Sequence, residues 1–354
     1  MRKRGYSHPH VTTSHRLLKA VRREPADKTP VWFMRQAGRF LPEYRELRKS
    51  HSILEICAEP ELAAAAAMTA VKALPGLDGA IVFSDILQIL VPMGIQVEFA
   101  AGEGPRILNP VRSSADVAAL RPVEPERDLR GPLGGIRILR RELEGRMPVI
   151  GFAGAPFTLA TYLVEGGPSR DYAKVKRFMG AEPRAWDDLM TKLGDAVTAH
   201  LSAQAQAGAS LVQVFDSWVG ILGVDDYRRY VQDHMRRIFE ALRGKVPAIH
   251  FGTGTAALLE LMRDAGGDVI GLDWRVDLAD AWKRLGPGLA VQGNLDPTAL
   301  LLPLQELDRR IDAVLDRAAG RPGHIFNLGH GILPETPVEH VVAAIERVHA
   351  RTLP

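Results

Sequence analysis

The chain has 354 residues, of which 46% are hydrophobic and 25% charged, a composition typical of a globular protein with a large core. The formal net charge is +3, with Lys and Arg scattered among nearly as many Asp and Glu, so no basic stripe for nucleic acid is visible and no such partner is expected. The single cysteine, Cys57, excludes an intrachain disulfide and a cysteine cage for zinc or an iron–sulfur cluster.

Residues 1–13 are polar and carry no periodic pattern, so we expect a flexible tail there, followed by one catalytic domain over residues 14–354. The sequence has neither a secretory signal nor a long apolar run. It therefore predicts a cytoplasmic protein that does not bind membranes.

Short apolar runs alternate with helical patterns along the whole chain. These runs are continuous rather than alternating, as expected of parallel strands that are covered on both faces. Repeated β-then-α units without a change in composition predict a single-domain (β/α)₈ TIM barrel, with a doubly wound sheet as the alternative. The expected strands are Pro30–Met34, Ala80–Phe83, Val149–Phe152, Leu211–Phe215, Ala248–Phe251, Val269–Leu272, Ala290–Gln292 and His324–Asn327.

Two insertions interrupt this alternation. Ile95–Phe99 and Arg106–Leu108 flank the turn Gly102–Pro105 and predict a hairpin after the second strand. Gly166–Pro168 predicts a flexible loop after the third. Both could fold over the barrel mouth as a lid, or they could be ordinary surface turns.

Two arginines follow the first expected strand. The active site of such a barrel is built at the carboxyl ends of its strands. Arg35 and Arg39 stand four positions apart around Gly38, and their forked donors suit a carboxylate or a phosphate. The alternative is a pair of rim salt bridges to Glu43 or Glu46.

An acid follows the second expected strand. Asp85 lies between apolar neighbours, where a carboxylate is costly unless a cation or N–H groups meet it. A helix cap or a salt bridge to arginine is the structural alternative. We favour a functional role, because residues 86–90 do not predict a helix that begins directly after Asp85.

Other strand ends carry weaker signals. Ser217 lacks the Gly-x-Ser-x-Gly motif of a hydrolase nucleophile and is expected to donate a hydrogen bond. His330, between glycines, is placed for ligand contact, whereas Tyr162 taken alone is better explained as a buried tyrosine with its hydroxyl bonded. We expect His250 to be structural, and Asp273–Arg275 could be an internal ion pair.

What the strand ends lack is also informative. No lysine directly follows a strand, which disfavours a Schiff-base aldolase. The chain has no Gly-x-Gly-x-x-Gly or Walker loop, so a bound nucleotide is not expected.

From about Pro30 to Ile345 the sequence resembles the uroporphyrinogen decarboxylase family. The resemblance is carried by seven runs of residues, which are Pro30–Arg45 (PVWFMRQAGRFLPEYR), Phe83–Leu87 (FSDIL), Gly151–Gly167, Gln213–Trp218 (QVFDSW), Gly271–Trp274 (GLDW), Gln292–Pro297 (QGNLDP) and Asn327–Gly331 (NLGHG).

The resemblance implies a barrel, usually a homodimer, that removes carbon dioxide from the four acetate side chains of uroporphyrinogen III to give coproporphyrinogen III. It implies that Arg35 and Arg39 bind substrate carboxylates and that Asp85 meets the pyrrole N–H groups, with Asp85 and Arg35 catalytic. It assigns peripheral carboxylates to Tyr162, Ser217 and His330, and places Phe215 against the macrocycle. Phe40 and Val82 depart from the pattern at apolar positions only.

We expect neither a metal nor an organic cofactor, because a protonated pyrrole can itself accept the electrons that decarboxylation releases. The sequence leaves the proton donor open. Two other functions remain as alternatives. A corrinoid-linked methyltransferase would need zinc held by His-x-Cys and a further cysteine, whereas this chain has His250-Phe251-Gly252 at the comparable strand. A non-catalytic tetrapyrrole carrier could use the same arginines.

Overall fold

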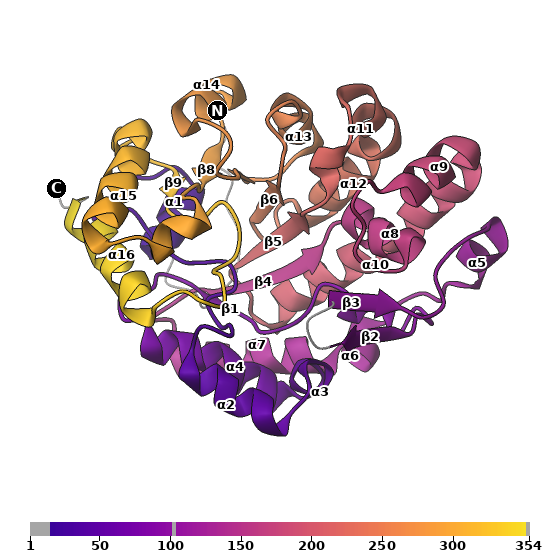
Figure 1. The fold of residues 1–354 in the computed structure, drawn as a ribbon, viewed down its shortest axis with the longest axis horizontal. Coiled ribbons are helices and arrows are strands. Elements are labelled where there is room, and N and C mark those ends of the chain that lie inside the picture. Colours follow the sequence, from indigo (N-terminus) through magenta and orange to yellow (C-terminus); the bar gives the residue numbers. More distant parts are fainter. Residues whose placement is uncertain (1–14, 101–103, 352–354) are drawn as a thin grey trace.

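A computed structural model describes residues 15–100 and 104–351, so the predicted tail over residues 1–13 lies outside the described residues. Helices surround a curved parallel sheet (Figure 1). Its strands follow one another in chain order, which confirms the barrel and contradicts a doubly wound sheet. They are β1 (Ala80–Ile81), β4 (Val149–Gly154), β5 (Leu211–Asp216), β6 (Ala248–Gly252), β7 (Val269–Gly271), β8 (Ala290–Gln292) and β9 (His324–Ile325).

The first expected strand, Pro30–Met34, is not a regular strand, and that prediction was too long. It forms one parallel bridge, Val31 to Phe326. Pro30 has no N–H to donate, which limits the ladder. Even so, the Phe326 N–H donates to Pro30 O at 2.8 Å and the Asp78 N–H donates to Val31 O at 2.8 Å. The segment thus bonds to both edges of the sheet and closes it.

Side chains fill the barrel interior, so it is a core and not a pore. The inward-facing cluster includes Ile150, Ile249 and Phe251 from the strands, and Leu17 comes from α1 (Arg16–Val21). A buried polar chain crosses the same space, in which Trp32 Nε1 donates to Gln292 Oε1 at 3.0 Å and Gln292 Nε2 donates to Gln213 Oε1 at 2.9 Å. These amides satisfy one another, as buried polar groups must.

The outer layer consists of helices that pack against the sheet, with α4, α7 and α10 lying against β1, β4 and β5. Besides α1, the helices are α2 (Pro42–Ser50), α3 (Ile53–Ala58), α4 (Pro60–Ala73), α5 (Ser114–Ala119), α6 (Pro125–Asp128), α7 (Arg130–Leu143), α8 (Pro156–Glu165), α9 (Ala173–Ala181), α10 (Pro183–Ala207), α11 (Val224–Tyr230), α12 (Gln232–Leu242), α13 (Leu259–Ala265), α14 (Leu278–Leu285), α15 (Leu304–Ala318) and α16 (Val338–Arg351), with 3₁₀ turns η1 (Gln88–Leu90), η2 (Val219–Ile221) and η3 (Pro297–Leu301).

The predicted hairpin is confirmed as the antiparallel pair β2 (Val97–Ala100) and β3 (Gly104–Ile107). Of its expected turn, residues 102 and 103 lie outside the described residues, and Gly104 and Pro105 belong to β3. The hairpin is fastened to the end of α8, because the Ile107 N–H donates to Gly166 O at 2.9 Å. The two predicted insertions therefore meet on one side of the barrel. Their role as a lid stays a prediction.

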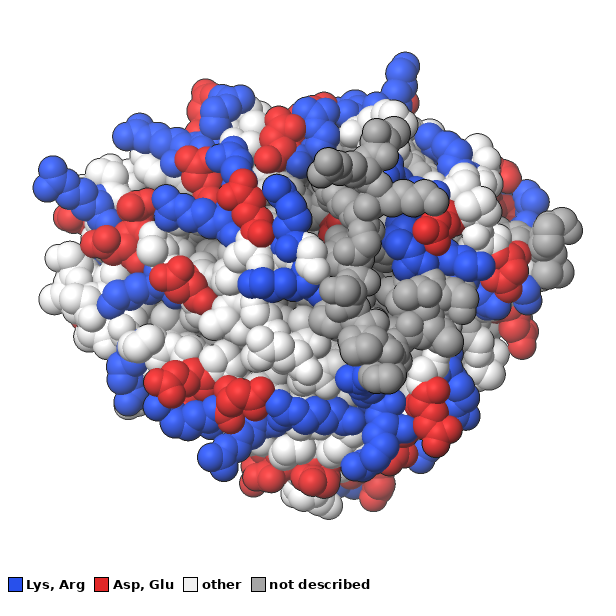
Figure 2. Space-filling view, turned by 180° about the vertical axis from the view of Figure 1, so that it is seen from behind, with Lys and Arg blue, Asp and Glu red and all other residues white. Residues whose placement is uncertain are grey.

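Charges of both signs cover the face in Figure 2, where acidic side chains lie among the basic ones. Among the described residues, no helix is long and apolar enough to cross a membrane.

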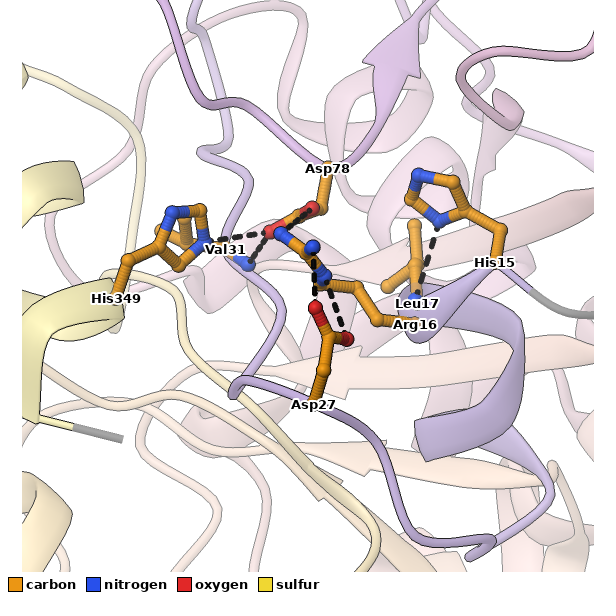
Figure 3. Close-up of polar contacts among 7 residues, drawn as sticks. All are labelled: His15, Arg16, Leu17, Asp27, Val31, Asp78 and His349. Atoms are coloured by element: carbon orange, nitrogen blue, oxygen red, sulfur yellow. Dashed lines mark hydrogen bonds and ion pairs between the residues drawn. The ribbon is translucent and has the colours of Figure 1, made fainter. Parts of the chain in front are cut away.

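One carboxylate, Asp78, joins three parts of the chain (Figure 3). Its side chain is 4% exposed. It accepts from Val31 N at 2.8 Å, from Arg16 Nη1 at 3.2 Å and from His349 Nε2 at 2.9 Å. Asp78 thus ties α1 and α16 to the segment that closes the barrel, and Arg16 is further held by Asp27 at 2.6 Å.

We predict that Asp78→Ala lowers the free energy of unfolding by about 1–3 kcal/mol, because three donors lose a buried acceptor. Asp27→Ala is the control. The Asp27 side chain is 58% exposed, and such a surface ion pair contributes less than about 1 kcal/mol. Urea unfolding of both variants measures the difference. Equal losses would contradict the central role of Asp78.

Candidate active site

The floor of the barrel mouth is aromatic. Phe152 and Phe215 lie at the edge of the inward-facing cluster, near the carboxyl ends of β4 and β5. Phe152 meets Phe215 edge-on at 5.5 Å between ring centroids, and Phe215 meets Phe251 at 5.8 Å. Phe215 is half-buried, so part of its ring is open to the mouth.

Arg35 follows the closing segment in an unusual backbone conformation. Its φ is +61°, a left-handed value that costs a residue other than glycine about 1–2 kcal/mol. The turn is held by Gln36, whose Oε1 accepts from Phe33 N at 3.1 Å and whose Nε2 donates to Gly79 O at 3.0 Å. The Arg35 stem crosses the backbone of Gly331, where a Cβ would overlap it. Strain at such a position is typical of functional sites.

Asp85 lies just after β1. Its Oδ1 accepts from Leu87 N at 2.8 Å, at the turn that leads into η1. As expected, no α-helix begins directly after Asp85, but the Asx turn that leads into η1 was not predicted, because it depends on local backbone geometry. Burial raises the pKa of the Asp85 carboxyl, and the Leu87 N–H and the Arg35 charge oppose that shift. Within the described chain, no donor bonds its second oxygen.

Tyr162 on α8 belongs to the same group of residues. Its ring meets Trp218 at 6.0 Å. Burial raises the Tyr162 pKa, the Trp218 side chain lowers it, and the charges of Asp85 and Arg35 act on it with opposite signs. Arg35, Asp85 and Tyr162 therefore lie close enough for the charges of the first two to act on the third.

His330 is half-buried on the loop that follows β9. Burial and the positive charges of Arg35 and Arg275 lower its pKa to about 4. The imidazole is therefore neutral at pH 7. Because the Gly331 N–H donates to Nδ1 at 2.8 Å, the ring carries its proton on Nε2 and can donate from there.

Arg39 is exposed and lies near Tyr44. Burial raises the pKa of Tyr44 to about 12, and the positive charges of Arg48 and Arg39 oppose this shift. The Tyr44 ring contacts Phe83 at 5.3 Å, two residues before Asp85. In the described part of the chain, neither Arg35 nor Arg39 forms an ion pair, and Glu46 pairs with Lys49. The rim salt bridges considered from the sequence are therefore not observed.

Ser217 is half-buried at the end of β5. Its carbonyl accepts from the Thr253 hydroxyl, and no described residue bonds its own hydroxyl. The expected structural role of His250 is confirmed, because it is fully buried, its ring lies 4.8 Å from that of Phe239, and burial lowers its pKa to about 4. The Asp273–Arg275 ion pair is also confirmed, at 2.9 Å.

Sequence reasoning assigned no role to Asp216 or Trp218. Asp216 is fully buried and accepts from Thr158 Oγ1 at 2.8 Å, and burial raises its pKa to about 7. Thr158 Oγ1 in turn accepts from Trp218 N at 3.2 Å, so Asp216 supports the loop that carries Ser217 and Trp218. The signals in the sequence were the run of polar and aromatic residues directly after the fourth expected strand and its place in the run Gln213–Trp218 that carries the family resemblance.

No metal centre is evident in the part of the chain that the structure describes, where no group of three or more His, Cys, Asp or Glu could hold a metal ion.

Solved structures of other proteins share this fold. A methyltransferase from Methanosarcina mazei has a TM-score of 0.80 at 20% identity, covering 96% of this chain and 99% of that chain. A B12-independent methionine synthase from Shewanella sp. W3-18-1 has a TM-score of 0.52 at 12% identity, covering 82% and 89%. At these identities the similarity concerns the fold alone.

Sequence comparison identifies the family. The model of the uroporphyrinogen decarboxylase (URO-D) family matches residues 12–351. Proteins named uroporphyrinogen decarboxylase from Sorangium cellulosum (56% identical, 95% of this chain and 96% of theirs) and Roseiflexus sp. (53%, 95% and 98%) are similar over nearly their whole lengths. The chain belongs to the uroporphyrinogen decarboxylase family.

We predict that Asp85→Asn raises the melting temperature at pH 7 to 8. A carboxyl whose pKa is raised by folding destabilises the folded state wherever it is ionised, that is, at pH values above its pKa. Asparagine removes the charge and keeps an oxygen to accept from Leu87 N. Calorimetry measures the shift, and the stabilisation should disappear toward pH 4. A lower melting temperature at pH 8 would contradict the direction of this pKa shift.

Proposed function

We propose that this chain decarboxylates uroporphyrinogen III, converting its four acetate side chains to methyl groups and giving coproporphyrinogen III, without a metal or an organic cofactor. We further propose that it acts in the cytoplasm as a homodimer. The observation that carries the proposal is the half-buried Asp85 carboxyl at the barrel mouth, with a raised pKa and within the field of Arg35. Membership of the family supports the choice of substrate.

The mouth fits an anionic ring with an apolar body. The guanidinium groups of Arg35 and Arg39 are exposed and can bind substrate carboxylates in a bidentate manner. The neutral His330 ring and the Ser217 hydroxyl can donate to further carboxylates. The open part of the Phe215 ring offers an apolar surface for the macrocycle.

Each decarboxylation needs a place for an electron pair. A proton adds to the pyrrole carbon beside the acetate-bearing one and gives a cationic ring. The bond between the acetate methylene and its carboxylate then breaks, its electron pair enters the ring, and carbon dioxide leaves. A second proton converts the exocyclic methylene to a methyl group, and loss of the first proton restores the aromatic ring, so one proton is consumed in total.

Asp85 supplies the negative charge that this cation needs. In a water-poor pocket, a fixed charge aimed at a developing charge stabilises the transition state more than it would in water. The raised pKa belongs to the empty pocket. Pyrrole N–H donors that bond the carboxylate would favour its ionised form and lower that pKa as substrate binds.

A corrinoid-linked methyltransferase would have the same barrel, but this chain lacks the zinc ligands that such an enzyme needs. At the end of β6 the chain reads His250-Phe251-Gly252, and the only cysteine of the sequence, Cys57, is buried in α3. A thiolate zinc site with two cysteines cannot be built from one.

The test of the proposed function is an anaerobic incubation of the purified protein with uroporphyrinogen III, followed by chromatography of the oxidised porphyrins. We expect coproporphyrin and partly decarboxylated intermediates, with rates that do not change when chelator, pyridoxal phosphate or thiamine diphosphate is added. Binding of the substrate without any product would instead favour the carrier. Reversible loss of turnover on metal removal would overturn the cofactor-free mechanism.

We predict that Asp85→Asn lowers turnover by orders of magnitude while substrate binding is largely kept, and that Asp85→Glu retains part of the rate. The first variant removes the charge, and the second displaces it. In the wild type, kcat/KM, which reports groups of the free enzyme, is highest above the Asp85 pKa and is lost as the pH falls through it, at a pH above that of an ordinary aspartate. Steady-state kinetics across pH, with folding checked by melting, measures this. A rate for Asp85→Asn close to the wild-type rate would contradict the mechanism.

We predict that Arg39→Ala mainly raises KM, whereas Arg35→Ala also lowers kcat, because the charge of Arg35, unlike that of Arg39, acts on Asp85, Tyr162 and His330. Each lost charged hydrogen bond should cost roughly 1.5–3 kcal/mol. Lys49→Ala, which removes an exposed cation of α2 paired with Glu46, is the control. Kinetics like those of the control in both variants would return the two arginines to a structural role.

A further inference from the structure

The loop after β7 holds an arginine in an unusually fixed position. Asp273 is 1% exposed. Its Oδ1 accepts from the Arg275 backbone N–H at 2.9 Å, and its Oδ2 accepts from Arg275 Nη1 at 2.9 Å and from Gly254 N. One buried carboxylate therefore fixes both the backbone and the guanidinium of Arg275.

A stacking contact fixes the plane of the same guanidinium. The Arg275 Cζ lies 3.9 Å from the centroid of the Trp274 ring. Such stacking and a planar fork leave a guanidinium little freedom to lose when it binds a ligand. The side chain is nevertheless 53% exposed. Among the described residues only one of its five N–H donors has a partner, so the others remain available.

Arg275 belongs to the same rim as the candidate active site. The loop after β9 lies directly against the loop after β7, because a Cβ at Gly329 would overlap the backbone of Trp274. The next residue is His330, and the positive charges of Arg35 and Arg275 both lower its pKa. The Asp273–Arg275 ion pair therefore lies beside the candidate active site.

We propose that Arg275 is a further substrate-binding residue, a third arginine that takes a peripheral carboxylate of the ring beside His330, with Asp273 and Trp274 as the residues that position it. This inference rests on the proposed function. The chemistry is that of a carboxylate, which can come from an acetate or a propionate side chain of uroporphyrinogen. A carboxylate that approached the free edge of this guanidinium would meet donors already oriented by the buried pair.

The test compares Arg275→Gln and Arg275→Lys with the wild type. We expect Arg275→Gln to raise KM for uroporphyrinogen by about tenfold to a hundredfold while kcat changes little, because a charged hydrogen bond made in both ground and transition states is lost. Arg275→Lys keeps the charge but loses the bidentate geometry and the stacking on Trp274, so its KM should lie between those of the wild type and Arg275→Gln. Arg309→Gln, which removes an exposed cation of α15 paired with Glu306, should match the wild type.

Anaerobic binding of the product, followed by quenching of tryptophan fluorescence, distinguishes the two sources of the carboxylate. Coproporphyrinogen keeps the propionates and has lost the acetates. If Arg275 holds a propionate, Arg275→Gln weakens product binding by the same factor as substrate binding. If it holds an acetate, only substrate binding weakens.

Either of these binding results supports the inference. Unchanged KM and unchanged product affinity in a folded Arg275→Gln protein would overturn it, and so would a loss of kcat and melting temperature alone, which a structural ion pair would give. Failure of the proposed function is a separate outcome, because it would appear as a wild-type protein without turnover.

Discussion

The arrangement of the barrel mouth depends on how residues 30–34 close the sheet. The carbonyl of Pro30 accepts from Phe326 next to β9, and the carbonyl of Val31 accepts from Asp78 next to β1. The Asp78 carboxylate in turn accepts from Val31 N. The chain then turns sharply at Arg35. Because the turn lies between the first and last strands, the charge of Arg35 reaches both Asp85 and His330.

The site combines features that disfavour folding with features that suit catalysis. The Asp85 carboxyl is buried enough to raise its pKa, and Arg35 has a left-handed backbone. Each lowers stability, and the fold compensates elsewhere, for example in the fully satisfied chain of Trp32, Gln292 and Gln213 inside the barrel. Proteins tolerate such local costs where function requires them. On this view the mouth is preorganised for a ring that brings its own N–H donors and carboxylates.

Much of the fold could be predicted from the sequence, because strands buried on both faces read as continuous apolar runs. Seven of the eight expected strands appear near their predicted places. The predicted strand over 324–327 was too long, since β9 ends at Ile325. Past that point the backbone bonds to side chains as well as to neighbouring strands, as at Leu328, whose N–H donates to Asn327 Oδ1 at 2.8 Å. Such bonds leave no periodic signal.

The candidate site was predictable where it depended on strand ends, as for Arg35, Asp85 and His330. It was not predictable where a residue acts through another element. Asp216 reaches the loop after β5 only through Thr158 on α8, and the stacking of Arg275 on Trp274 depends on the conformation of the loop. The Asx turn at Asp85 was not predicted either, because the sequence does not fix the backbone of a turn that lacks glycine and proline.

The most direct test of the account is the pKa of Asp85 itself, measured by carbon-13 NMR of protein with labelled aspartate carboxyls and assigned by the signal that Asp85→Asn lacks. In the empty protein the pKa should lie above the ordinary aspartate value of about 3.9. On anaerobic binding of coproporphyrinogen it should fall, because pyrrole N–H groups bond the ionised carboxylate. A pKa that rises on binding, or does not change, would contradict the claim that Asp85 meets the ring as a negative charge.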